Sequence, residues 1–254
     1  MKTSRIITGL YMILKMLFRK RIVLLLIVIM PIVFLGVVRL TASTRAIPFR
    51  LASLDETTFI WEPLRNISLI FFSLTSTGFL VSFLALSLIQ SNSEVNRRLV
   101  ICGYHPFELL ISNLVALLLI IILTAVYIGL LINIFFQVHH FFDYVFGLTL
   151  IGFVYGCYGL TVGSLVRGRL EGVFLIVMLA NIDAGWLQNP MYFAEASNNA
   201  IIRLLPAYYP AQSAIISAFT DYSISRAAFF SLLYGTCFLV ISLMVYYNRM
   251  KIRK

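Results

Sequence analysis

The sequence predicts an all-α polytopic membrane protein with six transmembrane helices, on two observations. Of its 254 residues, 61% are hydrophobic and 12% are charged, and the mean hydropathy is +0.95. A soluble domain of this composition would expose much of its apolar surface to water. The apolar residues also form six runs near the span length of roughly 20 residues. The predicted spans are residues 22–40, 66–90, 109–136, 145–166, 172–190 and 226–247, in a single domain covering 1–254.

The basic residues give the orientation. Lys and Arg number 20 against 10 Asp and Glu, for a formal net charge of +10. They gather before the first span, after the last span and in the short loops that follow spans two and four. Alternating spans place these four clusters on one side, which is the positive-inside pattern of cytoplasmic segments. We therefore expect a multi-pass protein of the plasma or inner membrane with both termini cytoplasmic, and no nucleic-acid partner.

The first 65 residues are predicted to form three parts. Residues 1–21 mix apolar and basic residues at helical spacing, which indicates a helix lying in the membrane interface. The alternative is a simple cytosolic extension of the first span. Residues 22–40 are expected to be an uncleaved span, not a signal peptide, with a kink at Pro31. Residues 41–65 are polar and are expected to form an irregular external segment, with Trp61 in the interface.

The loop between spans two and three differs most from its surroundings. Ser91 or Ser93 is a suitable N-cap for a short helix, and Gly103 is a suitable end. Such a helix is amphipathic and lies outside the membrane. Its apolar side carries Leu99 and Cys102. Its polar residues, together with Tyr104, are available to a partner in water, and they are Glu94, Arg97 and Arg98.

Hydroxyl and acidic residues in spans two and five suggest a polar path. Ser68, Thr75 and Ser82 are seven residues apart and share a helix face. They are a candidate translocation path, although hydroxyls in membrane helices more often bond backbone carbonyls or a neighbouring helix. Asn181 and Asp183 lie in the far half of span five, and an acid inside a membrane is a functional candidate by default. The alternative for Asp183 is a structural acid satisfied by backbone groups or by Arg203.

Two further stretches predict packing. Span four carries Gly152, Gly156, Gly159 and Gly163 on one face, which allows another helix to approach closely. Residues 191–225 are too broken to cross the membrane and too apolar for a free loop. They are expected to form an external re-entrant hairpin of two short helices, 200–205 and 210–219, the second with Pro210 at its first position.

No motif in the chain indicates catalysis or a metal. The P-loop, H-E-x-x-H and G-x-S-x-G patterns are absent from the sequence. His139 and His140 near Asp143 hint at a metal, but without a second ligand cluster we expect a solvated turn and no metal site. The three cysteines are expected only to pack, because Cys102 falls in a cytosolic loop and the other two in spans.

These features together resemble one family, the membrane subunit of type-2 ATP-binding cassette (ABC-2) exporters, over nearly the whole chain. The loop after span two carries the closest resemblance. Glu94, Arg97, Arg98 and Leu99 stand where the family has a charged cluster leading into hydrophobic residues, and Pro106 stands where a proline opens span three. The resemblance implies that this loop is the coupling helix that fits a cleft in the ATPase subunit. Residues 204–210 are similar to the family's short helices before the last span.

The resemblance also implies the partners and the reaction. The chain would pair with a second permease subunit, identical or paralogous, and with a separate P-loop ATPase that binds ATP and Mg. No cofactor is expected in this chain, which is not itself an enzyme. Where the family often has Gly-Thr after the acidic cluster and a lysine early in span three, this chain has Arg97-Arg98 and Asn113.

The expected cargo is lipophilic or amphipathic, such as a drug, an antibiotic, a lipid or a peptide, because few charges lie within the spans. Three alternatives stay open at this point. One is a permease that exports a polysaccharide or glycolipid. The second is a membrane-embedded enzyme that uses Asp183 with an external histidine. The third is a secondary transporter or a non-transporting assembly partner.

Overall fold

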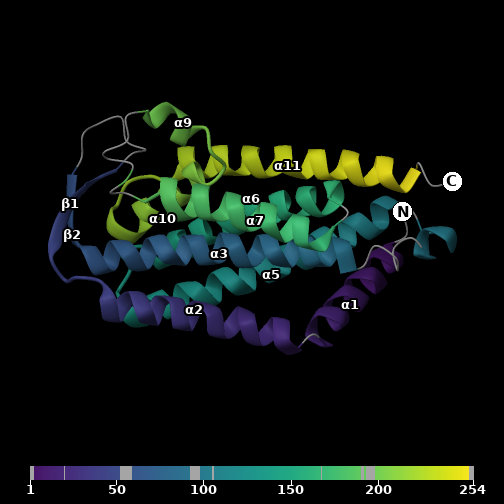
Figure 1. Cartoon of the computed structure of the whole chain (residues 1–254), viewed down its shortest axis with the longest axis horizontal. Helices are drawn as coiled ribbons and strands as arrows, with labels where there is room; N and C mark the ends of the chain where they lie inside the picture. Colours follow the sequence, from purple (N-terminus) through teal and green to yellow (C-terminus); the bar gives the residue numbers. More distant parts are fainter. Residues whose placement is uncertain are drawn as a thin grey trace.

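Long helices that run alternately in opposite directions form the body of the protein (Figure 1). The computed structural model describes residues 3–19, 21–51, 59–91, 98–104, 106–166, 168–189, 192 and 198–251. In chain order the long helices are α2 (Arg21–Thr41), α3 (Leu64–Ser91), α5 (Pro106–Phe135), α6 (Phe141–Leu165), α7 (Arg169–Ile182) with its π-helical continuation η1 (Asp183–Leu187), and α11 (Ser225–Lys251).

The two ends of this bundle differ. Both termini, residues 98–104 and the connection from α6 to α7 lie at one end, which we call the basic end (Figure 1). The opposite end, called the hairpin end, holds the strands β1 (Ala46–Arg50) and β2 (Phe59–Pro63) and the short helix α9 (Asn199–Arg203). The segments expected on the cytoplasmic side therefore gather at one end of the bundle.

Five helices in the described part of the chain are long and apolar enough to cross a membrane. They are Leu64–Gln90, Phe107–Phe135, Phe141–Leu165, Arg169–Leu187 and Ser225–Asn248. Helix α2 contributes a shorter apolar stretch, Ile27–Thr41, so a sixth span stays a prediction. The fold is that of a predominantly helical, multi-pass membrane protein.

Helix α6 lies at the centre of the bundle and packs against α3, α5, α10 (Tyr208–Phe219) and α11. Four of its five glycines, Gly152, Gly156, Gly159 and Gly163, lie against α3 and α5. A Cβ at Gly159 would collide with the carbonyl oxygen of Ser82, and one at Gly152 would lie 2.8 Å from a methyl carbon of Ile121. The absence of side chains at these positions is what allows the backbones of α3 and α6 to approach this closely.

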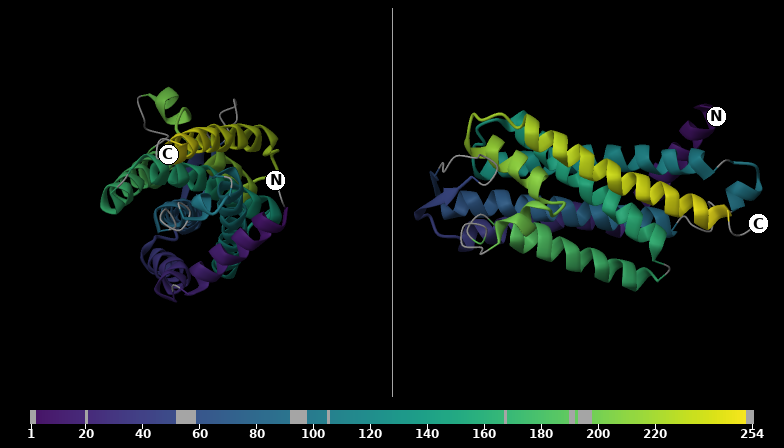
Figure 2. Two further views of the ribbon diagram at one scale, coloured as in Figure 1. Left: turned by 90° about the vertical axis from the view of Figure 1, so that its right-hand side faces the viewer. Right: turned by 90° about the horizontal axis from the view of Figure 1, so that it is seen from above.

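Helix α1 (Thr3–Arg19) is separate from α2 and lies at an angle to the bundle (Figures 1 and 2). Its buried stripe contains Gly9, Ile13 and Leu17, spaced four residues apart, while Ile7 and Phe18 are exposed. A Cβ at Gly9 would lie 2.8 Å from Ser112 Oγ on α5. The helix is therefore not a straight extension of the first span: it is amphipathic and packs its buried stripe against α5.

The expectation that residues 41–65 are irregular is wrong for part of the segment. Strands β1 and β2 pair antiparallel, with Pro48 opposite Trp61. Phe49 and Leu51 are buried in the core, while Trp61 is 69% exposed. This alternation has period two, but it spans only five residues in each strand, and an isolated hairpin is marginal in water. Packing against the ends of the helices stabilises it.

The two short helices expected before the last span are present as α9 and α10. Pro210 was predicted to be the first residue of the second helix. This is wrong, because helix α10 begins at Tyr208 and Pro210 is its third residue. Nearly every residue of α10 is buried, and a Cβ at Gly147 of α6 would lie 2.8 Å from the Ala214 backbone. Helix α10 is thus inserted among the long helices at the hairpin end.

Candidate functional site

The segment predicted to contact an ATPase is described from Arg98 onward, and Glu94 and Arg97 lie outside the described residues. Residues 98–101 are helical. Gly103 has a φ of +87° and ends the helix, as the sequence predicts. The Tyr104 N–H donates to the Leu99 carbonyl at 3.0 Å and the Gly103 N–H to the Val100 carbonyl at 3.1 Å. This pair of bonds is a Schellman motif, which fixes the direction of the chain into α5.

The predicted contact residues in this segment differ in exposure. Arg98 is exposed, while Leu99 and Tyr104 are half-buried. Helix α5 begins at Pro106. Residues 98–104 lie at the basic end (Figure 1). A short helix with a well-defined C-terminal end therefore lies shortly before α5, one of the longest helices of the bundle.

Asp183 is the most completely buried acid in the described residues, with an exposed fraction of 0%. One carboxylate oxygen, Oδ2, accepts hydrogen bonds from the Tyr155 hydroxyl at 2.7 Å and from the Ala207 N–H at 2.9 Å. The other oxygen, Oδ1, accepts from the Gln188 side-chain amide at 3.1 Å. The carboxylate thus joins α6, the end of η1 and the residue that precedes α10.

The π-helical turn explains how Asp183 reaches this position. The Gln188 N–H would bond the Ala184 carbonyl in an α-helix, but it bonds the Asp183 carbonyl at 3.2 Å instead. The Thr75 hydroxyl of α3 donates to the Ala184 carbonyl at 2.9 Å. Asp183 then faces α6 while Trp186 is 59% exposed on the other side. The wide turn is held by α3 and α6 together.

Arg203 is not the partner of Asp183, although the sequence suggested it. No ion pair of Asp183 within 4.0 Å occurs in the described part of the chain, and Arg203 lies beside Tyr208. A backbone N–H, from Ala207, is among its donors, as the structural alternative expected, and Arg203 is not. Tyr155 and Gln188 were not predicted from the sequence as partners of Asp183. Both side chains are uncharged, so no complementary charge marks them as partners of an acid.

The five residues proposed as a polar path do not form one continuous set. Ser82 is buried and bonds the Phe79 carbonyl of its own helix at 3.0 Å, and Ser68 is half-buried. Thr75 bonds the Phe71 carbonyl as well as Ala184. Asn181 is exposed and bonds the Val177 carbonyl, so it lies away from Asp183. The Thr75 and Ser82 hydroxyls donate to backbone carbonyls, which is the alternative that the sequence left open.

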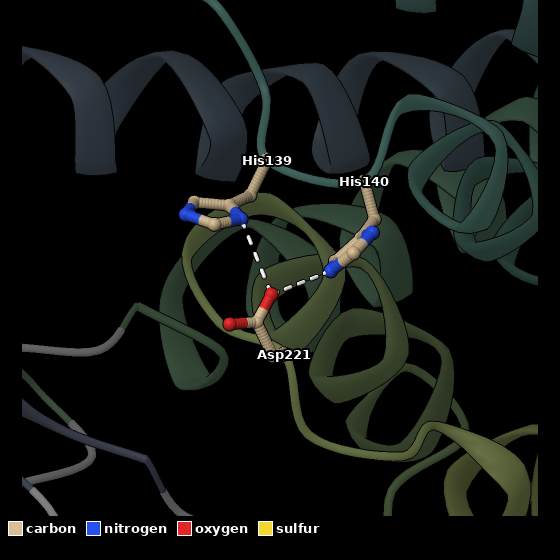
Figure 3. Close-up of side chains that lie close together, drawn as sticks. All are labelled: His139, His140 and Asp221. Atoms are coloured by element: carbon tan, nitrogen blue, oxygen red, sulfur yellow. Dashed lines mark hydrogen bonds and ion pairs between the residues drawn. The ribbon is translucent and has the colours of Figure 1, made fainter.

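The two histidines near the start of α6 have an acidic partner, but it is Asp221 and not the nearby Asp143. His140 Nε2 lies 2.7 Å and His139 Nδ1 3.3 Å from the same Asp221 oxygen (Figure 3). Asp221 follows α10 and is 81 residues after His140 in the sequence. Sequence spacing alone gave no sign of this cluster.

Replacing Thr75 by valine is expected to lower the free energy of unfolding by about 1 to 2 kcal/mol, because the Ala184 carbonyl loses its donor from α3. Thr149→Val is the matched control. Thr149 is also half-buried, but its hydroxyl bonds only the Val145 carbonyl of its own helix. Unfolding in mixed micelles measures both. Equal losses would show that the bond between α3 and η1 adds nothing.

The comparisons with known proteins add no relative. A scan against protein-family models and a search of curated proteins each found no match. The candidate sites therefore rest on the geometry described above.

Proposed function

We propose that the chain is the membrane permease subunit of an ATP-driven exporter of the ABC-2 type, coupled to a separate ATPase subunit. The observation that carries the proposal is the helix at residues 98–101, which lies at the basic end shortly before α5. Its Schellman termination gives the C-terminal end of this helix a defined backbone conformation. Arg98 at its start is exposed and available to a partner.

A movement of this helix would be transmitted to the interior of the bundle by the packed helices α3 and α6. Helix α3 lies against α6 without intervening side chains at Gly159, so the two helices are expected to move as one body. Helix α6 carries Tyr155, which binds Asp183, and α3 carries Thr75, which binds the adjacent residue. A push from an ATPase dimer on the coupling helix would therefore act on the hairpin end as a rigid-body shift.

The remaining architecture supports the same proposal. The amphipathic α1 packs on α5 beside the basic end, and α10 is inserted among the helices at the other end. In the proposal α2 is the sixth span, both termini are cytoplasmic, and α9 and α10 form the external hairpin. The faces of α7 and α11 are largely exposed in the single chain, which suits contact with lipid and with a second permease subunit.

The proposed cargo is lipophilic or amphipathic, with a polysaccharide or glycolipid as the alternative. The few charges within the candidate spans support the first class. An enzyme that uses Asp183 with an external histidine has less support. The hydrogen bonds of Asp183 come from Tyr155, Gln188 and a backbone N–H, and both His139 and His140 face Asp221.

Co-purification from the native membrane tests the proposal. We expect a P-loop ATPase to co-purify with the tagged chain and to be lost from the triple variant Glu94→Ala, Arg97→Ala, Arg98→Ala, because the variant removes the charges available to the partner. The control is Arg169→Ala, Glu171→Ala, two exposed charges in the first turn of α7, at the basic end. Absence of an ATPase from all three samples would refute the proposal, and equal loss from both variants would refute the coupling role of this loop.

A further inference from the structure

Three side chains from two distant segments converge at the hairpin end. His139 and His140 precede α6, and Asp221 follows α10. Their ligand atoms, one from each residue, all lie within 4.8 Å of one another. Both imidazole rings turn a nitrogen toward the same carboxylate oxygen, as Figure 3 shows. The rings are not stacked on each other, since their planes differ by 50°.

Backbone hydrogen bonds hold this arrangement independently of the side chains. The His139 N–H donates to the Ala218 carbonyl at 3.2 Å, and the His140 N–H donates to the Ser217 carbonyl at 3.0 Å. Both carbonyls belong to the last turn of α10, just before Asp221. The turn that carries the histidines is thus fixed to the segment that carries the acid. A binding site whose backbone is already held in place loses little conformational freedom when it binds.

We propose that His139 Nδ1, His140 Nε2 and an oxygen of Asp221 bind a divalent transition-metal ion, with Zn²⁺ as the natural occupant. Imidazole nitrogen suits zinc and related borderline ions, whereas calcium and magnesium prefer oxygen ligands. Three protein ligands with a fourth position open to water is a common zinc arrangement. The bound ion would link the connection between α5 and α6 to the connection between α10 and α11.

The geometry suits such an ion after a small adjustment. With bonds of roughly 2.0 to 2.2 Å to nitrogen and oxygen, two ligands of a tetrahedral zinc ion lie roughly 3.3 Å apart. His139 Nδ1 lies 3.3 Å from the Asp221 oxygen, and His140 Nε2 lies 2.7 Å from it, so the second separation must lengthen by a few tenths of an ångström. The two imidazole nitrogens lie within 4.8 Å of each other, and a turn of the rings about their side-chain bonds brings them to the distance that an ion requires. The side chains are 46% to 78% exposed, so these rotations meet little resistance.

The number of side chains aimed at the acid also favours a cation. One histidine is enough to pair with it. The second ring, aimed at the same oxygen, gives the arrangement the ligand number of a metal site.

Cobalt titration tests the proposal directly and does not depend on the proposed transport function. The full chain, purified with a tag free of histidine and treated with a chelator, is placed in lipid nanodiscs. Cys102 and Cys237 are exposed thiols that also bind these metals, so both are replaced by serine in the parent. We expect the visible absorption of Co²⁺ to saturate at one ion per chain and to disappear when Zn²⁺ displaces it.

Matched variants decide which residues bind the ion. His140→Gln and Asp221→Asn are each expected to weaken Co²⁺ binding about tenfold or more. Removing even a residue that only hydrogen-bonds a metal ligand typically lowers metal affinity by about this factor. Asp143→Asn, an exposed acid in the first turn of α6, and His105→Gln, the remaining histidine, are expected to bind as the parent does. Parent-like binding in both His140→Gln and Asp221→Asn would overturn the proposal.

A second measurement needs no variant to fold. Because an ion that binds only the folded chain stabilises it by mass action, Zn²⁺ is expected to raise the melting temperature of the parent in a concentration-dependent way. Mg²⁺ at the same concentration is the control and should leave it unchanged. The absence of both a saturable cobalt signal and a zinc-dependent shift would show that the cluster is an ion pair only.

Discussion

Asp183→Ala is expected to lower the free energy of unfolding by about 3 to 5 kcal/mol, one of the largest effects of a single substitution in this chain. The change removes the acceptor for three donors in a buried site: the Tyr155 hydroxyl, the Ala207 N–H and the Gln188 amide. Each buried donor left without a partner costs about 1 to 3 kcal/mol. The loss also disconnects α6, η1 and α10 from one another.

Asp183→Asn is the control that separates hydrogen bonding from charge. The Asn oxygen is able to take the position of Oδ2 and accept from Tyr155 and Ala207. The Asn NH₂ would then face Gln188, whose own carbonyl oxygen Oε1 is buried without a partner and accepts from it after a flip of the Gln188 amide. We therefore expect Asp183→Asn to lose about 1 kcal/mol or less.

Reversible unfolding in mixed micelles measures both Asp183 variants. If the asparagine variant unfolds as easily as the alanine variant, the hydrogen-bond account of this site is wrong. The same variant also tests function. A chain with Asp183→Asn that keeps its stability and its ATPase but fails to move cargo would show that the negative charge is used in transport.

Gly159→Leu is expected to prevent the protein from accumulating in a folded form, and Gly159→Ala to destabilise it by about 3 kcal/mol or more. The added Cβ meets the Ser82 carbonyl oxygen and lies 2.9 Å from Ala85 Cβ, both on α3. Overpacking in a core costs typically about 1 to 3 kcal/mol, and here the obstacle is backbone that cannot rotate away. The close approach of α3 and α6 at this position would have to open.

Two other glycines serve as graded controls for this prediction. A Cβ at Gly163 would lie 3.2 Å from Ile89 Cβ, a tight but adjustable contact, whereas a Cβ at Gly36 on α2 meets nothing within 4 Å. Gly36→Ala is expected to leave stability unchanged or to raise it by up to about 1 kcal/mol, since alanine favours helix. Fluorescence-detected size-exclusion and thermal unfolding rank the three alanine variants. The same stability in all three would show that the close approach is unimportant.

The helices and their ends follow from local sequence, and their prediction was largely correct. Helices α3, α5 and α6 begin and end within a few residues of the predicted limits, because apolar length is a property of the chain itself. Gly103 was predicted to end its helix and does so with a positive φ, which glycine adopts without a steric cost. The glycine face of α6 likewise follows from helical spacing.

The partners of polar residues were not predictable in the same way. Asp143 is next to the histidines in the sequence, yet the histidines face Asp221, which only the folding of α10 into the bundle brings near. Arg203 was one suggested partner of Asp183, beside backbone groups, but a π-helical turn directs the acid toward Tyr155. Strands β1 and β2 were missed because five-residue alternations are weak signals without the core that they cover.

The sequence by itself determined that this protein is a helical, multi-pass membrane protein, where most of its helices lie and that α6 has a face without side chains. Those properties depend on the number, spacing and size of residues within one segment. Only the tertiary structure decided what each polar group binds. That choice depends on which segments meet in space, because a buried carboxylate or carbonyl must be satisfied by the nearest available donor, however distant it is along the chain.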